Sequence, residues 1–78
     1  MKLPIRTTSE LGQLIRSMRE SRGLTQQDVA NGLGVSRKWV NEVESGKPRA
    51  ELYRVLDVIG YLGGEVRVTT EDSRAEKS

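Results

Sequence analysis

The stretch that decides the fold is RGLTQQDVANGLGVSRKWVNEVESGK, residues 22–47. It contains two short runs with the apolar spacing of a helix, at 26–33 and at about 37–45. Each run begins directly after a hydroxyl side chain, Thr25 or Ser36, of the kind that caps helix N-termini. Only about three residues separate the runs and one is a glycine, which is the connection of a helix-turn-helix.

The flanking segments predict one further helix on each side. Thr7 and Glu10 have the spacing of a capping box, and apolar residues recur at i, i+3, i+4 and i+7 along residues 8–22. Gly23 then ends this first helix. The fourth helix follows Pro48, and its apolar positions are Leu52, Val55, Leu56, Ile59 and Leu62.

The segment EVRVTT, residues 65–70, alternates Val66 and Val68 with polar residues, as a half-buried strand does. A lone strand leaves its backbone groups unpaired, and the short segment 2–6 is the one mate that this chain offers. We therefore expect the strand to pair with its copy in a second chain, with Val66, Val68 and Leu62 in the dimer interface. The alternative is a frayed segment.

Length and composition indicate a single domain over residues 1–70 and a disordered polar tail over 71–78. A domain of 78 residues buries only about 60% of its unfolded surface, so help from a partner chain is expected. Cysteine and histidine are both absent, which removes disulfides, thiolate or imidazole metal sites and Ser-His or Cys-His nucleophiles. We expect no enzyme activity, no cofactor and no bound metal.

No apolar run approaches the roughly 20 residues that span a bilayer, and the first ten residues have no signal-like apolar core. The sequence predicts a cytoplasmic protein without a membrane partner, associated with the nucleoid when it is bound to DNA. The net charge is only +2, but residues 16–54 carry eight basic and five acidic side chains. This excess suggests a nucleic-acid partner, although solvated helical surfaces can share it.

Placing residues 37–45 at about 100° per position separates two faces of the third helix. Val40 and Val43 point inward. The opposite face mixes both charges with polar groups, and its members are Arg37, Lys38, Asn41, Glu42 and Ser45. Lys38 and Glu42 are four residues apart in the less favourable order, so a solvated helix face remains the alternative to a DNA-reading one.

Several positions of this stretch resemble the XRE/Cro/CI-type helix-turn-helix repressors. They are a Leu-Thr-Gln start, the small Ala30 inside the second helix, Leu-Gly-Val-Ser across the turn, and Glu-x-Gly after the third helix. The resemblance covers about residues 11–62. The short fourth helix that runs into a glycine pair and a strand is similar to the HipB/Y4mF-type antitoxins of type II toxin-antitoxin operons.

The resemblance implies base contacts from the third helix, at Ser36, Arg37, Lys38, Asn41 and Glu42. Arg37 or Lys38 can donate to guanine, Asn41 can pair with adenine, and Glu42 can accept from cytosine. Glu42 needs Lys38 or a cytosine amine to offset its charge near phosphates. The remaining expected contacts are to the DNA backbone, and they involve Gln26, Lys47, Arg49 and, less directly, Arg16.

The roles of the Arg19–Glu44 pair and of Trp39 each have more than one interpretation. The resemblance implies that Arg19 of the first helix pairs with Glu44 of the third, against the simpler interpretation of two separate exposed charges. Trp39, the only tryptophan, lies at the margin between the apolar and polar faces. It could pack beside the start of the fourth helix, stack on the DNA backbone or contact a toxin.

Taken together, these features predict an all-α, four-helix, lambda repressor-like domain with one strand paired across a homodimer. The implied function is repression at a palindromic operator in double-stranded DNA, with two recognition helices about 34 Å apart. The resemblance further implies an antitoxin that regulates its own operon and neutralises a HipA-like kinase toxin. The alternatives are a phage or plasmid repressor, a restriction-modification controller protein, and a helical adaptor that binds only protein.

Overall fold

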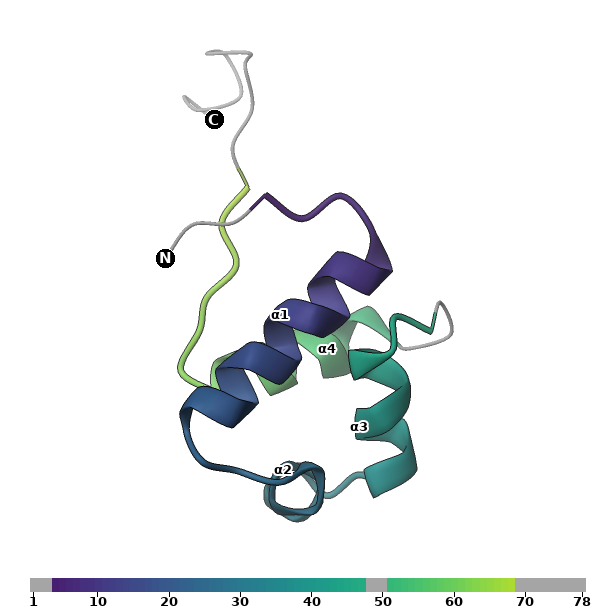
Figure 1. Ribbon diagram of the computed structural model, residues 1–78, viewed down its shortest axis with the longest axis vertical. Helices are drawn as coiled ribbons and strands as arrows, with labels where there is room; N and C mark the ends of the chain where they lie inside the picture. Colours follow the sequence, from purple (N-terminus) through teal and green to yellow (C-terminus); the bar gives the residue numbers. More distant parts are fainter. Residues whose placement is uncertain (1–3, 48–50, 69–78) are drawn as a thin grey trace.

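The computed structural model describes residues 4–47 and 51–68. This part of the chain forms four helices: α1 (Thr8–Ser21), α2 (Gln26–Leu33), α3 (Arg37–Glu44) and α4 (Leu52–Tyr61). In Figure 1, α1 crosses in front of α4, α2 is seen end-on and α3 stands beside them. The predicted all-α four-helix order is confirmed, and the bounds predicted for the second helix match those of α2.

The start of α1 differs in detail from the predicted capping box. The Thr7 hydroxyl accepts from the Glu10 N–H at 3.0 Å, as expected. The Glu10 carboxylate accepts from the N–H of Arg6 at 2.8 Å, one residue before the N-cap. At the other end, α1 ends at Ser21 and Arg22 is its C-cap. The helix is therefore one residue shorter than the predicted range 8–22.

Both helices of the helix-turn-helix begin at the predicted side-chain caps. Thr25 accepts from the Asp28 N–H at 3.0 Å while the Asp28 carboxylate accepts from the Thr25 N–H at 2.8 Å, which completes a capping box. Ser36 accepts from the N–H of Trp39 at 3.0 Å. Between the helices, Gly34 adopts a left-handed φ of 71°, a conformation that glycine reaches without steric cost. These caps and the glycine set the turn that delivers α3 to the surface.

One apolar cluster, to which all four helices contribute, fixes their arrangement. α3 packs against α1 and α2, and α2 also packs against α4. The buried members are Ile15, Val29, Ala30, Val40, Val43, Val55, Val58, Ile59 and Leu62. At the far end of α3, the Thr8 hydroxyl donates to the carbonyl of Gly46 at 2.8 Å, so the start of α1 also holds the end of α3.

The chain after α4 passes α1 without forming a strand in the described residues 65–68 (Figure 1). The start of this segment packs against α1. A Cβ atom on Gly64 would lie 2.5 Å from the Met18 side chain, so there is no free space at this position. Residues 69 and 70 of the expected strand, the segment 1–3, Arg49 and the expected tail 71–78 lie outside the described residues. No helix in the described part of the chain is long and apolar enough to cross a membrane.

The structure corrects the placement of Leu62 in a dimer interface. Leu62 is only 2% exposed and belongs to the core of the single chain, so its side chain has no surface to offer a partner. The exposed apolar residues of α4 are instead Leu52, Tyr53, Leu56 and Tyr61. The helical periodicity was right, but Leu62 falls on the buried face together with Val58 and Ile59.

Candidate nucleic-acid interface

The outward face of α3 carries most of the polar side chains that the sequence placed there. Arg37, Lys38, Asn41 and Ser45 are exposed, and Ser36 is exposed at the cap. Glu42 is only partly exposed, so it lies at the edge of this face. Val40 and Val43 point into the core at 1% and 5% exposure. The arrangement brings two cations and an amide to one surface, and their contact with bases stays a prediction.

An open groove begins beside this face. It joins the end of α1 and the first turns of α2 and α3, and its lining residues are Arg19, Glu20, Gly23, Leu24, Thr25, Gln26, Gln27 and Arg37. Gln26 and Arg37, two residues predicted to contact DNA, therefore border the same groove. The groove also opens onto the N-terminus of α2, where the partial positive charge of a helix favours anions.

The expected ion pair between Arg19 and Glu44 is present and joins α1 to α3. The Arg19 Nε and Nη2 atoms donate to the two Glu44 carboxylate oxygens at 2.7 and 3.0 Å. Their side chains are only 10% and 3% exposed, so the alternative of two separate surface charges does not hold. Hydrogen bonding to Glu44 raises the pKa of the Arg19 guanidinium, against the lowering effect of burial.

Two further contacts of this pair have no signal in the sequence. The Gln26 Nε2 atom on α2 donates to Glu44 at 3.1 Å, and Arg19 Nη1 donates to the Leu24 carbonyl at 2.7 Å. Every buried side-chain polar atom of the described residues has a partner. Gln26 was expected at the DNA backbone only, because helix periodicity cannot reveal a contact between side chains of different helices.

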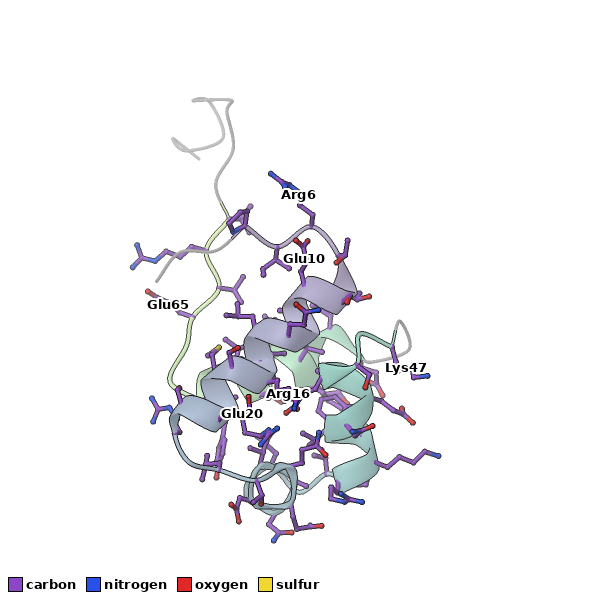
Figure 2. All side chains as sticks on the ribbon, viewed as in Figure 1. Arg6, Glu10, Arg16, Glu20, Lys47 and Glu65 are labelled. Carbon is purple, nitrogen blue, oxygen red and sulfur yellow. The ribbon has the colours of Figure 1, made fainter. Side chains whose placement is uncertain are left out.

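Two of the basic residues expected at the DNA backbone, Lys47 and Arg16, lie on different elements of the described chain. Lys47 is exposed just after α3 and projects from that end of the helix (Figure 2). Arg16 lies on α1 beside Glu20, with 3.5 Å between its Nε and the carboxylate, and both side chains are more than half exposed. Arg49 lies outside the described residues. Within the described ranges, no group of acidic side chains could hold a metal ion.

Trp39 is partly buried and packs against the core cluster. This contact gives the tryptophan a structural role, while packing beside the start of the fourth helix, stacking on DNA and contact with a toxin stay predictions.

The sequence matches a known domain family and a known bacterial protein. A model of a helix-turn-helix domain matches residues 10–68. A protein from Sinorhizobium fredii (strain NBRC 101917 / NGR234), named as the uncharacterized HTH-type transcriptional regulator y4mF, is 31% identical over 70 residues. That match covers 90% of this chain and 92% of the relative.

Solved structures of HipB have the same fold. A HipB variant in complex with an O2 20mer superposes with a TM-score of 0.82 at 15% identity, over 92% of this chain and all of that one. HipB with an O4 20mer, and the complex of HipA, HipB, O2 and O3, each give 0.81 at 15% identity, over 91% of this chain and all of theirs. At this identity the likeness concerns the fold alone.

Proposed function

The chain is an XRE-type member of the helix-turn-helix domain family with the fold of HipB, and we propose that it represses transcription by inserting α3 into the major groove of operator DNA. The observation that carries this proposal is the outward face of α3. Arg37, Lys38 and Asn41 are exposed there in the first turns of the second helix of the motif, where base edges are read.

The chemistry of this face suggests which bases it reads. Arg37 and Lys38 donate to guanine O6 and N7, and Asn41 pairs with the N6 and N7 of adenine. The Ser36 hydroxyl already accepts from the Trp39 N–H, and its own hydrogen remains to donate to DNA. Glu42 accepts from a cytosine amine at the edge of the face. Gln26, Lys47 and Arg49 hold the backbone and fix the register.

We further propose a homodimer on a palindromic operator. Apart from Ile5, the exposed large apolar side chains of the described residues lie on α4 and on the segment after it: among them Leu52 is 70% exposed, Leu56 44%, Val66 55% and Val68 90%. Within the described residues, the backbone of 65–68 has no backbone hydrogen-bond partner. A second copy would pair residues 65–70 as a two-stranded sheet and cover the apolar side chains. Two α3 helices would then reach successive major grooves about 34 Å apart.

The proposed biological setting is a type II toxin-antitoxin operon, in which this cytoplasmic, non-enzymatic protein regulates its own promoter and neutralises a HipA-like kinase. The proposal is supported by the likeness to HipB, one structure of which contains HipA. A phage or plasmid repressor and a restriction-modification controller are the alternatives with the same DNA chemistry. The gene beside this one separates them.

The deciding experiment is binding of the purified protein to its own upstream DNA, measured by fluorescence anisotropy at several salt concentrations. Arg37→Ala and Lys38→Ala are each expected to weaken binding about 5- to 150-fold, the factor of a base contact worth roughly 1–3 kcal/mol. Arg54→Ala, which removes a cation from α4, is the matched control. If the parent shows no affinity for this DNA even at low salt, the chain is better described as a protein-binding adaptor.

A further inference from the structure

The side chain of Gln26 has a fixed orientation in the DNA-free protein. Its Nε2 atom lies 3.1 Å from a Glu44 oxygen. A carboxylate can only accept hydrogen bonds, so the amide nitrogen and not the amide oxygen must face Glu44. Glu44 is in turn held by two hydrogen bonds from Arg19, whose third nitrogen is tied to the backbone of Leu24. Three helices therefore determine where the Gln26 amide points.

This orientation leaves the Gln26 amide with unused hydrogen-bonding capacity. The nitrogen carries two hydrogens and only one is directed at Glu44. The second N–H diverges from the first in the plane of the amide, and the Gln26 side chain makes no other hydrogen bond to a described residue. Gln26 also borders the open groove together with Arg37, so its side chain lies beside the surface that carries the base-reading residues.

We propose that Glu44, held in place by Arg19, is a positioning residue for DNA binding, because it orients the Gln26 amide so that its free N–H donates to a phosphate oxygen of the DNA backbone. The inference rests on the proposed function, since a phosphate comes near Gln26 only when α3 lies in the major groove. Arg19 affects Glu44 in two ways. It fixes the carboxylate, and it cancels the negative charge that would otherwise repel the phosphate.

The hydrogen bond to Glu44 preorganises the Gln26 side chain for binding a phosphate, and this raises DNA affinity. A free glutamine side chain samples many rotamers and must lose that freedom when it binds a phosphate. Here the loss has already occurred on folding, through the hydrogen bond to the nearly buried Glu44. The ion pair therefore strengthens DNA binding without touching DNA.

The first test is an NMR spectrum of the side-chain amides in the free and DNA-bound protein. We expect one Gln26 Hε2 resonance to be displaced by the carboxylate in the free protein, and the other to move when a duplex of the protein's own upstream sequence is added. Two Gln26 resonances at ordinary amide positions in the free protein would overturn the inference, whether or not the protein binds DNA.

The second test is a double-mutant cycle in DNA affinity. Gln26→Met removes the amide at nearly constant length, and we expect it to weaken binding about tenfold, as loss of a charge-assisted hydrogen bond does. The other arm is Arg19→Met with Glu44→Met, which replaces the buried pair by apolar side chains and is compatible with folding. In that background Gln26→Met should weaken binding less than twofold, because the amide is no longer oriented.

Gln13→Met is the matched control for this cycle, because Gln13 is exposed on α1 and outside the groove. It should leave affinity within twofold of the parent. An equal effect of Gln26→Met in both backgrounds, or none in the parent, would overturn the positioning role while leaving the DNA-binding function intact. If the parent itself does not bind the duplex, the proposed function fails first.

Discussion

Gly12 on α1 lies directly against the backbone of Glu44 on α3. A Cβ atom at residue 12 would come within 2.5 Å of the Glu44 carbonyl oxygen and equally close to the carbonyl of Val43. Real Cβ atoms do not approach an oxygen so closely, and a backbone carbonyl at a helix end cannot rotate away as a side chain can. The contact therefore sets the distance between α1 and α3.

Gly12→Ala is expected to destabilise the fold and to shift α3. Overpacking of this kind costs about 1–3 kcal/mol of unfolding free energy, measured by urea or thermal denaturation. Gly60→Ala is the matched control, because no heavy atom beyond its own helix turns lies within 4 Å of the added Cβ. Alanine there should raise stability by roughly 0.5–1 kcal/mol through helix propensity. Unchanged stability of Gly12→Ala would contradict the close approach.

The buried ion pair predicts a strong asymmetry between single and paired substitutions. Arg19→Ala leaves the Glu44 carboxylate buried without its main partner, which should cost about 3–5 kcal/mol of unfolding free energy. The pair Arg19→Met with Glu44→Met should stay close to the parent, since it removes both charges. Stability is measured by circular dichroism in urea.

Arg16→Ala is the control for that experiment. Arg16 pairs with Glu20 at 3.5 Å, but both side chains are more than half exposed. An exposed pair contributes roughly 0–1 kcal/mol, so this substitution should change the urea midpoint little. Equal losses for Arg16→Ala and Arg19→Ala would mean that burial does not distinguish the two pairs.

The cap of α2 predicts a pH-dependent contribution to stability. Hydrogen bonds from the backbone N–H and then the side chain of Thr25 lower the pKa of Asp28. A carboxyl whose pKa is lower in the folded state stabilises the fold above its unfolded pKa of about 4, and this contribution disappears as pH falls through the lowered value. Asp28→Asn should therefore lose stability relative to the parent at pH 7 and converge toward it on acidification.

The measurement is the urea midpoint of parent and variant between neutral and strongly acidic pH. Asp57→Asn serves as the control, because Asp57 is exposed on α4 and its side chain makes no hydrogen bond to a described residue. Its curve should run parallel to that of the parent. A difference between Asp28→Asn and the parent that stays constant with pH would contradict the assignment.

The sequence predicted the local features of this fold well, because each depends on residues close together in the chain. The Thr25 and Ser36 caps, the Gly34 turn and the inward Val40 and Val43 all follow from spacing within one helix or one turn. The family resemblance added the Arg19–Glu44 pair. The predictions from spacing needed no knowledge of how the helices cross, whereas the pair joins two helices and came only from the resemblance.

The features that sequence reasoning missed depend on contacts between elements. The bond from Gln26 to Glu44 forms only because α2 and α3 meet at a particular angle, and no spacing encodes that angle. Leu62 was assigned to a dimer surface because its periodicity marks an apolar face without saying what covers it. In the folded chain the core of the same protomer covers it, at 2% exposure.

The dimer remains the prediction with the largest consequence for function, and it depends on two apolar surfaces that one chain leaves uncovered. Val68 is 90% exposed and Leu56 is 44% exposed. Val68→Arg or Leu56→Arg would place a charge in the proposed contact between two chains, where its desolvation is costly. Each variant should therefore sediment as a monomer at concentrations where the parent is a dimer, and should bind a palindromic duplex with reduced affinity.

Arg67→Gln is the matched control, because neighbouring residues of a strand point to opposite faces and residue 67 lies away from the apolar face. If Val68→Arg and Leu56→Arg both remain dimers with parental affinity, the chains meet through another surface, and the spacing of the two recognition helices must be set by that surface instead.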